Sequence, residues 1–386
     1  MTVPHAGIEY GMNTRIKDGA TIAVAMSGGV DSSVAAALLA ERGFHVIGLT
    51  MRLFCYAEKP SSEKSCCNTQ SIADARAVCD RIGAPHYVIG SEKEFRSDVI
   101  QRFVDSYLSG STPNPCVDCN TFIKFKFLLH RAMSLGADYL ATGHYVRLGE
   151  RDGSPCLLRG LDPDKDQSYF LWGIHRAALD KLVFPLGEFR KPEVRELAGK
   201  YGLAVREKTE SQEICFVEND SVEDFIRNYS AGGEIEPGYP ASTVPGPVVD
   251  RSGQVVGEHR GSAFYTIGQR KGLGVSLGRP VYITRIDTVR NEIEIGEGED
   301  LGSSSFSAAQ VNYLADPPPG KSYRAEIQIR YRHTPAAGMV TAAGKYSVRV
   351  ETERPQRAVT RGQSVVFYDG DLVLGGGVIS ETESRK

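Results

Sequence analysis

The sequence predicts an α/β doubly wound parallel sheet, followed by a small connector domain and a C-terminal all-β, barrel-like domain. Strand and helix patterns alternate up to about residue 218, which indicates repeated β-α-β units. Gly and Pro become frequent over residues 232–257, and from about residue 322 short strands alternate with Gly, Pro and Asp turns. We expect four parts: an N-terminal extension (1–19), an α/β domain (20–220), a central connector (221–297) and a β-barrel (298–386).

The first strand and helix of the α/β domain flank a glycine-rich loop. Residues 21–26 are apolar and β-branched, as in a buried parallel strand, and residues 33–42 form a helix that ends before Gly43. We expect further strands at 45–54, 87–89 and 139–142, and helices that start at Ser71 and Ser91 or cover 122–135, 192–201 and 221–229. Such sheets bind ligands at the carboxyl ends of their strands, where the loop and the pair Gly143-His144 lie.

The rest of the chain predicts antiparallel strands. Residues 247–257 have the pattern of a hairpin that turns at 251–253. A small barrel or sandwich is indicated by alternating segments at 323–329, 346–350, 365–368 and 372–379. Three prolines at 317–319 precede this block and indicate a nearby boundary.

Composition and charge exclude several classes of protein. No stretch has the roughly eighteen apolar residues of a membrane span, and the N-terminus lacks a secretory signal. We therefore expect a cytoplasmic protein with no membrane partner. The formal net charge of −3 argues against general nucleic-acid binding. A local basic patch at residues 260–290 holds six Lys/Arg against Asp287 alone and is a candidate RNA-binding surface, with a solvated basic face as the plainer interpretation.

The glycine-rich loop has the composition of an anion site, and its residues are Ala25, Met26, Ser27, Gly28, Gly29, Val30, Asp31 and Ser32. A strand, a Gly-rich loop and a helix together direct backbone N–H groups at a bound anion. The glycines allow phosphate to approach, the serines add donors, and Asp31 can hold Mg²⁺ or an amide. A plain strand-to-helix turn is the alternative, whereas a Walker A loop is excluded because no Gly-Lys-Ser/Thr follows. The loop resembles the SGGxDS loop of ATP pyrophosphatases, which implies cleavage of ATP into AMP and pyrophosphate.

Eight cysteines in an apparently cytosolic chain are expected to be mostly thiols. Cys79 and Cys156 fit the pattern of buried, small apolar residues. Cys116 and Cys119 form a CxxC pair, which suits a shared metal or a redox pair. Cys215 stands alone and is structural or catalytic.

Several sequence blocks together resemble the bacterial tRNA-specific 2-thiouridylases. In chain order these blocks are residues 112–120 with 123–125 (an NPxxxCN…KF pattern), 141–145, 165–170, 211–216, 257–261, 265–274 and 375–379. The resemblance spans the chain from about residue 20 to 380. It implies a pyrophosphate-loop nucleotide-binding fold and an enzyme that replaces the C2 oxygen of the tRNA wobble uridine (U34) with sulfur.

The same resemblance implies roles for individual residues. ATP would contact the glycine-rich loop, Met51 and Gly143, and the uracil O2 would attack its α-phosphate. Cys215 would carry a persulfide delivered by a partner protein, and Cys119 would be the second thiol, which either releases sulfide or forms a disulfide with Cys215. Contacts to the anticodon stem-loop and the flipped wobble base are implied for His144, Lys165, Asp166, Gln167, Arg330, Tyr331 and Gln363. For His144, a buried and hydrogen-bonded histidine is the alternative.

One position departs from the family pattern. Some members carry Asp directly after Asn-Pro, where this chain has Cys116, so that an acid–base role passes to Asp118 or is absent. Cys116, Cys119 and Cys215 are also candidate ligands of an iron–sulfur cluster. Two rival hypotheses remain. One is another pyrophosphate-loop enzyme, such as an amidotransferase-linked synthetase or a lysidine-forming ligase, and the other is a noncatalytic, metal-bound RNA-binding module that uses Cys116 and Cys119.

Overall fold

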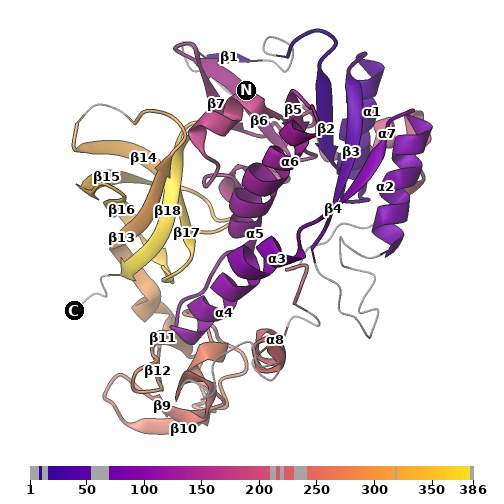
Figure 1. Cartoon of the computed structure of the whole chain (residues 1–386). Coiled ribbons are helices and arrows are strands. Elements are labelled where there is room, and N and C mark those ends of the chain that lie inside the picture. The colour runs from indigo at the N-terminus through magenta and orange to yellow at the C-terminus, as the bar shows by residue number, and fades with distance from the viewer. Residues whose placement is uncertain are drawn as a thin grey trace.

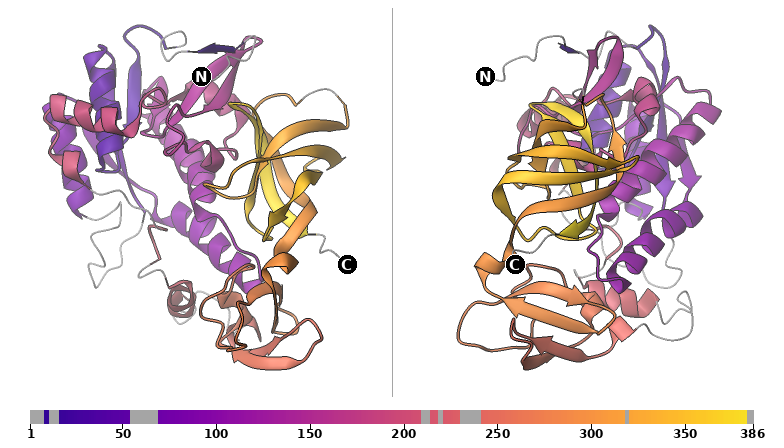
Figure 2. Two further views of the ribbon diagram at one scale, coloured as in Figure 1. Left: turned by 180° about the vertical axis from the view of Figure 1, so that it is seen from behind. Right: turned by 90° about the vertical axis from the view of Figure 1, so that its left-hand side faces the viewer.

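The computed structural model describes residues 8–10, 16–53, 69–208, 214–217, 221–229, 241–317 and 320–382. In Figure 1 the α/β domain lies on the right, the C-terminal barrel on the left and the small central domain below. Figure 2 shows the same arrangement from behind and from the side. Among the described helices, none has the length and hydropathy of a membrane span.

A five-stranded parallel sheet organises the α/β domain, as predicted. Its order is β4-β3-β2-β5-β8, and every neighbouring pair is parallel. The strands are β2 (Thr21–Ala25), β3 (His45–Arg52), β4 (His86–Gly90), β5 (Tyr139–Ala141) and β8 (Leu182–Val183). Ile22 and Val24 of β2 belong to one apolar core, and Ala23 between them belongs to another. The sheet is therefore buried on both faces, which is the doubly wound arrangement.

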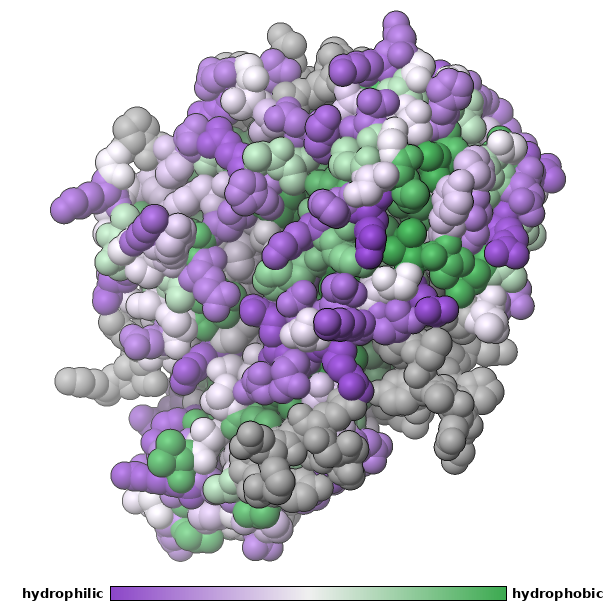
Figure 3. All heavy atoms as spheres, viewed as in Figure 1, coloured by the Kyte–Doolittle hydropathy of each residue, from purple (hydrophilic) through white to green (hydrophobic). Residues whose placement is uncertain are grey.

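Helices cover both faces of this sheet. One core includes residues of α1 (Val30–Glu41), α2 (Thr69–Arg81) and α7 (Lys191–Lys200), and the other includes Ala132 of α6 (Leu129–Ser134). Figure 3 shows hydrophobic residues gathered on the right of the Figure 1 view, over the α/β domain.

The helices after β3 and β4 differ in detail from the sequence patterns. In the described chain α2 already begins at Thr69, so Ser71 is not its N-cap, and the predicted capping box is wrong. Ser91 does precede a helix that ends at residue 108, as predicted, built from α3 (Glu92–Phe95), the π-helical η1 (Arg96–Ile100) and α4 (Gln101–Leu108). The Ser91 hydroxyl donates to the carbonyl oxygen of Arg52 (3.0 Å) and makes no capping bond.

The helix predicted from residue 122 begins earlier, at Pro115. It runs through α5 (Pro115–Asp118) and the π-helical η2 (Cys119–Leu128) into α6. Pro115 occupies the first turn, and the Asn114 side chain accepts a hydrogen bond from the backbone N of Val117 (3.4 Å). Cys116 and Cys119 therefore lie in the first turns of a helix.

Six strands close the C-terminal barrel. Their order is β18-β13-β16-β15-β14-β17, and β17 pairs back with β18 to complete the ring. The strands are β13 (Gly302–Tyr313), β14 (Ser322–Gln328), β15 (Ala336–Gly344), β16 (Ser347–Arg357), β17 (Ser364–Asp369) and β18 (Leu372–Thr382). The sequence patterns missed β13 and β15, because these strands are rich in Ser, Ala and Gly rather than in β-branched residues.

The three prolines do not mark a boundary. Pro317 follows β13, which pairs with β16 and β18 inside the barrel, so the proline segment joins two barrel strands. Pro318 and Pro319 themselves lie outside the described residues.

A hairpin that the patterns did not predict joins the α/β domain to the barrel. It is formed by β6 (Val146–Arg151) and β7 (Ser154–Arg159), and Leu158 pairs with Leu372 of β18. From the predicted N-terminal extension, β1 (Ile8–Tyr10) pairs with β6. These three strands and the barrel strands therefore form one nine-stranded sheet, which is separate from the five-stranded parallel sheet.

The central domain holds a four-stranded sheet of order β10-β9-β12-β11. Its strands are β9 (Gly246–Val249), β10 (Val255–His259), β11 (Tyr282–Asp287) and β12 (Glu292–Gly296), and β9 and β10 form the predicted hairpin. The helix α8 (Val222–Tyr229) precedes this domain and matches its predicted position. Short 3-10 turns occur at η3 (Ser168–Phe170), η4 (Arg176–Lys181), η5 (Ala204–Glu207), η8 (Ala241–Thr243), η9 (Ser262–Phe264) and η10 (Gly298–Leu301).

Asn312 on β13 provides a test of the contact between the barrel and the α/β domain. Its Nδ2 donates to the carbonyl oxygens of the buried residues Trp172 (2.7 Å) and Ile174 (2.8 Å). We expect Asn312→Ala to lower the free energy of unfolding by roughly 2 kcal/mol, because two buried acceptors lose their donor. Urea denaturation followed by the fluorescence of Trp172, the one tryptophan of the chain, measures this change. Arg324→Ala, which breaks an exposed ion pair with Glu353, should change it by less than about 0.5 kcal/mol, and equal losses would contradict the prediction.

Candidate active site

The glycine-rich loop leaves the carboxyl end of β2 and enters α1, as predicted. Gly28 has φ +69°, and a Cβ at this position would lie 2.3 Å from the carbonyl oxygen of Ser71 in α2. The hydroxyl oxygens of Ser27 and Ser32 lie 3.3 Å apart, and Gly29 is the N-cap of α1. The loop is thus pressed against α2 and brings two hydroxyl groups to the positive end of the α1 dipole, an arrangement that suits an anion.

The other predicted nucleotide residues lie around this loop. Ala25 ends β2, and Met26 and Val30 are buried in the core of the α/β domain, so their side chains fix the loop in place. A Cβ on Gly143, after β5, would lie 2.7 Å from the backbone N of Ser32. Glycine is therefore required where the end of β5 meets the loop.

Asp31 is held by side chains that the sequence analysis did not select. Lys191 Nζ donates to both carboxylate oxygens of Asp31 (2.7 and 3.0 Å), and the Tyr145 hydroxyl donates to one of them (2.7 Å). Lys191 is buried, so the charge of Asp31 is balanced inside the protein. The lysine and the aspartate are 160 residues apart in the chain, and only the fold brings them together.

A second unpredicted lysine lies against the loop. Lys208 Nζ donates to the carbonyl oxygen of Gly28 (3.0 Å) and to the carboxylate of Asp74 (2.7 Å). Burial raises the pKa of Asp74, but hydrogen bonds from Lys208 and Gln70 outweigh it and leave that pKa below its ordinary value. The ionised Asp74 thus holds the Lys208 ammonium group beside the loop. The one sequence signal for Lys208 is that it precedes the block containing Cys215.

The donor atoms do not form a metal site. Across the described ranges, no three His, Cys, Asp or Glu side chains are placed to hold a metal ion. Asp31 is joined by Lys191 rather than by a second carboxylate, so the chain does not by itself supply a Mg²⁺ site. Cys116, Cys119 and Cys215 do not converge as cluster ligands would have to. The steps proposed below use neither group.

His144 is a buried histidine in this structure. Its Nδ1 lies 2.6 Å from the Thr142 hydroxyl and its Nε2 lies 3.4 Å from Lys124 Nζ. Burial, and then the charge of Lys124, hold the pKa of His144 well below its ordinary value. This placement favours the alternative of a hydrogen-bonded core histidine, and the tRNA contact of His144 stays a prediction.

Cys119 and Cys215 pack against the same apolar cluster. This cluster includes the buried rings of Phe95, Phe103 and Phe216. Phe216 follows Cys215 in the chain and meets Phe95 and Phe103 edge to face, with ring centroids 5.7 and 5.1 Å apart. These aromatic contacts anchor the Cys215 segment on the helix bundle that carries Cys119.

The same cluster reaches the nucleotide end of the sheet. Met51, near the end of β3, packs against it together with Cys119 and Cys215. The structure thereby gathers one predicted nucleotide residue and both predicted catalytic cysteines. It leaves Cys116 exposed.

Asp118 lies beside Cys119 in the chain and is mostly buried. Burial raises the pKa of Asp118 to about 6, although Arg102, whose Nε lies 3.5 Å from the carboxylate, opposes the shift. The Arg102 guanidinium also lies 4.9 Å from the ring centroid of Phe122. A carboxyl group that titrates near neutral pH is therefore available on the helix of α5 and η2, which carries Cys116 and Cys119 and which we call the cysteine helix.

The barrel contributes residues to the same region. The ring of Tyr331 lies 4.5 Å from that of Phe170, whose carbonyl oxygen accepts a hydrogen bond from Asn120 Nδ2 (3.1 Å). Asn120 directly follows Cys119, so Tyr331 is connected to the cysteine helix through one intermediate residue.

Arg330 and Gln363 lie at the same end of the barrel. Arg330 Nη2 donates to the carbonyl oxygen of Ala358, and the carbonyl oxygen of Arg361 accepts from the backbone N of Thr112 (2.8 Å). Gln363 follows two residues after Arg361. This turn therefore abuts the segment that leads into the cysteine helix.

The predicted tRNA residues of the 165–167 segment make internal contacts. The Asp166 carboxylate accepts from the Ser168 hydroxyl (2.8 Å), and Gln167 Oε1 accepts from the backbone N of Tyr145 (3.0 Å). Lys165 is half-buried. The side chains of Asp166 and Gln167 thus shape the loop, and the tRNA contacts of this segment stay predictions.

Part of the positive charge of the basic patch at 260–290 is neutralised by acidic partners in the folded chain. Three of its six cations have acidic partners, most of them outside the segment: Arg260 pairs with Glu223, Arg279 with Glu297, and Arg285 with Asp287, Glu292 and Glu294.

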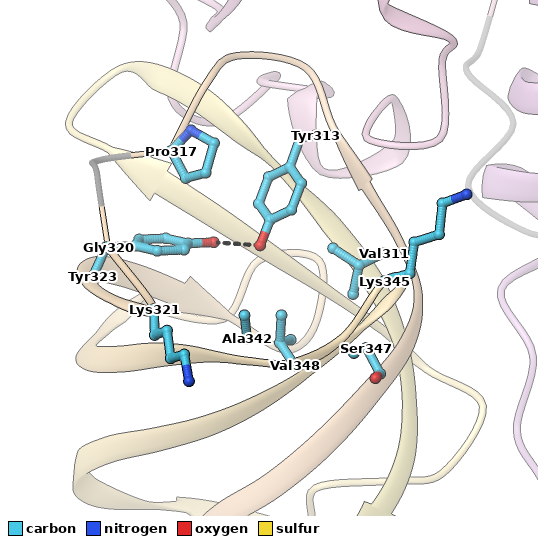
Figure 4. Close-up of a pocket in the computed structure, with 11 residues that line it drawn as sticks. Val311, Tyr313, Pro317, Gly320, Lys321, Tyr323, Ala342, Lys345, Ser347 and Val348 are labelled. Atoms are coloured by element: carbon cyan, nitrogen blue, oxygen red, sulfur yellow. Dashed lines mark hydrogen bonds between the residues drawn. The ribbon is translucent and has the colours of Figure 1, made fainter.

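A cavity of about 230 Å³ lies in the barrel rather than at this site (Figure 4). Its lining comes from the strands β13 to β16 and the turn before β14, and Tyr323 donates to the hydroxyl of Tyr313 (3.3 Å) at its wall. None of its lining residues is a predicted site residue.

Family models match the chain in the order of its three domains. They describe a tRNA methyl transferase HUP domain at residues 20–219, a tRNA methyl transferase PRC-barrel domain at 239–297 and an aminomethyltransferase β-barrel domain at 303–379. The tRNA-specific 2-thiouridylase MnmA of Carboxydothermus hydrogenoformans is 46% identical over 364 residues, which are 93% of this chain and 97% of that protein. The chain belongs to the tRNA-specific 2-thiouridylase family. Members of this family are tRNA sulfurtransferases, and nucleotide binding fits the α/β fold found here.

Other 2-thiouridylases match as fully. The protein of Geobacter metallireducens is 46% identical, covering 93% of this chain and 96% of that one, and the protein of Halothermothrix orenii is 44% identical, covering 93% and 99%. A solved 4-thiouridine synthetase–RNA complex with bound ATP is 17% identical to this chain, with a TM-score of 0.35. The match covers 54% of this chain and 50% of that one.

Gly28→Ala tests the geometry of the loop. The new Cβ would meet the Ser71 carbonyl at 2.3 Å with φ at +69°, so the loop has to move. We expect the melting temperature to fall by several degrees and the affinity for ATP to fall about tenfold or more. Gly29→Ala is the matched control for folding, since its Cβ would lie 3.4 Å from the Ser27 hydroxyl at φ −96°. Differential scanning fluorimetry and calorimetry measure both, and a wild-type melting temperature for Gly28→Ala would contradict the prediction.

Asp118 predicts a pH-dependent stability. Because its folded pKa of about 6 lies above the ordinary value of 3.8, ionisation destabilises the folded protein. This penalty is absent below about pH 4, grows as the pH rises and reaches at most about 3 kcal/mol above pH 6. We expect Asp118→Asn to raise the urea midpoint at about pH 8 and to leave it unchanged near pH 4. A gain that persists at the lower pH would argue against the raised pKa.

Proposed function

We propose that this chain catalyses the ATP-dependent replacement of the C2 oxygen of a tRNA wobble uridine by sulfur. The observation that carries the proposal is the shared cluster under Cys119, Cys215 and Met51, at the end of the sheet where the glycine-rich loop lies. A loop suited to the phosphates of ATP can activate an oxygen, and two thiols that pack with Met51 on one apolar cluster can deliver sulfur. The names of the family relatives support the same substrate class.

The first half-reaction is an adenylation. The uracil O2 attacks the α-phosphate of ATP, the O2–P bond forms, and the bond to pyrophosphate breaks. Backbone N–H groups of the loop and the N-terminus of α1 stabilise the charge on the departing pyrophosphate. Lys208 adds a positive charge at Gly28, and the Lys191–Asp31 pair fixes the start of α1. The adenylated O2 stays on C2 until sulfur attacks this carbon.

The second half-reaction transfers sulfur. Cys215 carries a persulfide whose outer sulfur comes from a persulfide-bearing donor protein. The Cys119 thiolate attacks Sγ of Cys215, which forms a Cys119–Cys215 disulfide and releases hydrosulfide. Hydrosulfide attacks C2, and the C2–O bond breaks with AMP as the leaving group.

The two sulfur steps also work in the reverse order. The outer persulfide sulfur then attacks C2 and expels AMP, and Cys119 afterwards cleaves the S–S bond to Cys215. Both orders end with 2-thiouridine, AMP and one disulfide. An external thiol must supply two electrons to restore the enzyme.

Asp118 is the proposed acid–base group on the cysteine helix, in place of the aspartate that some relatives have at the position of Cys116. Its pKa of about 6 allows the carboxylate to accept a thiol proton at neutral pH. The burial of Asp118 and its pairing with Arg102 support this assignment. Cys116 is exposed and does not belong to the apolar cluster that carries Cys119 and Cys215, so we assign it no role in the transfer.

Cysteine variants separate the two half-reactions. We expect Cys119→Ala and Cys215→Ala to lose 2-thiouridine formation by about a thousandfold while pyrophosphate release with ATP and tRNA stays within about threefold of the wild type. Cys116→Ala is the matched control and should retain both. Mass spectrometry of tRNA nucleosides, after incubation with ATP and a persulfide donor, and a pyrophosphate assay measure the two products.

Other outcomes would favour the rival hypotheses. Loss of thiolation in Cys116→Ala, together with iron and sulfide in anaerobically purified protein, would favour a cluster mechanism. Full activity of Cys215→Ala would favour a different pyrophosphate-loop reaction. No pyrophosphate release with unmodified tRNA would favour a noncatalytic RNA-binding module.

A further inference from the structure

Three arginines lie near the contact between the barrel and the central domain. Arg330 and Arg357 come from the barrel and Arg270 from the central domain, and we call them the junction arginines. Arg270 and Arg357 are exposed, and Arg330 is half-buried. Over the described part of the chain, no carboxylate lies within ion-pairing distance of any of the three.

The backbone at Ala358 is the point from which these three arginines are positioned. Ala358 N donates to the carbonyl oxygen of Leu301 (2.7 Å), and its own carbonyl oxygen accepts from Arg330 Nη2. Gly268 of the central domain packs so closely that a Cβ there would lie 2.8 Å from the Cβ of Ala358. Arg357 precedes Ala358, and Arg270 follows Gly268 by two residues. Both exposed arginines are therefore attached to one tight contact between the domains.

Tyr282 of β11 lies between the two exposed arginines. The Arg357 guanidinium lies 4.6 Å from the centroid of its ring. Arg357 first, and Arg270 as well, hold the pKa of Tyr282 below its ordinary value. An aromatic ring flanked by guanidinium groups is a pattern that binds nucleic-acid backbone and bases.

Two other arginines of the central domain differ from the junction arginines in their ion pairing. Arg279 and Arg285 of the same domain each have a carboxylate partner. The gathering of three like charges at the junction costs electrostatic energy that an added anion would offset. Burial and the charge of Arg357 both lower the pKa of Arg330, in accord with this unbalanced charge.

The junction is continuous with the candidate active site. Arg330 precedes Tyr331, whose ring packs on Phe170 (4.5 Å between centroids) and, through Phe170, contacts Asn120 next to Cys119. A polyanion that occupies the junction can therefore continue toward the cysteine helix.

We propose that the junction arginines and Tyr282 bind the sugar–phosphate backbone of the substrate tRNA on one side of the nucleotide that reaches Cys119. The proposal rests on the proposed function for the identity of the polyanion. Its energetic basis is charge neutralisation by arginine side chains that have no competing carboxylate among the described residues.

Salt-dependent tRNA binding tests this proposal. We expect Arg357→Ala and Arg270→Ala each to weaken binding of unmodified tRNA about tenfold near 100 mM salt. Each should also make the plot of log K against log salt concentration less steep, by about the amount that one phosphate contact contributes to the slope. Arg279→Ala and Arg285→Ala, which remove paired arginines from the same domain, should change affinity less than twofold. Arg357→Lys should restore most of the salt slope.

Turnover assays separate this proposal from the proposed function. At saturating tRNA the junction variants should thiolate with kcat within about twofold of the wild type, and only KM for tRNA should rise. Affinity and salt slope equal to the wild type in Arg357→Ala and Arg270→Ala would overturn the junction site, as would equal losses in the two control variants. If the wild type binds tRNA with the expected slope but forms no 2-thiouridine, the proposed function fails while the RNA site stands.

Discussion

The parallel register of β2 with its neighbours is the constraint on which the site depends. Val24 pairs with Ala141, the last residue of β5, so β2 and β5 end at nearly the same level, and Ala25 pairs with Leu49 of β3, which continues to Arg52. The glycine-rich loop leaves β2 there, and Gly143 leaves β5. A slip of one residue would turn the side chains of a strand to the opposite face and misplace each of these groups. The anion site is thus a consequence of how the sheet is assembled.

Much of this arrangement was predictable from the sequence, because near neighbours determine it. Apolar runs and glycine punctuation located four of the five strands of the sheet, all but the two-residue β8, and the β9–β10 hairpin. The features that were not predicted have weak strand propensities or depend on contacts between residues that are far apart in the sequence. The strands β13 and β15 consist largely of small residues, which carry no strong strand signal. Lys191 and Lys208 reach the loop across 160 and 180 residues, and no local pattern encodes such contacts.

Motif resemblance identified site residues without stating which of them are accessible. His144 and Asp166 use their polar atoms inside the protein, and three arginines of the basic patch are paired with carboxylates that a short window does not include. Burial and ion pairing are properties of the folded chain. Because of them, the proposed RNA-binding surface lies at the junction between the central domain and the barrel rather than over the whole basic patch at 260–290.

The sheet shared by the α/β domain and the barrel has a consequence for biosynthesis. The outer strand of the early hairpin, β7, pairs with β18, the last strand of the barrel. During translation β7 emerges long before β18, and until then one of its edges presents unpaired backbone groups that can recruit other chains. A ribosome that stalls before β18 leaves a chain prone to aggregate. Folding of the barrel therefore covers one edge of a hairpin that is synthesised long before it.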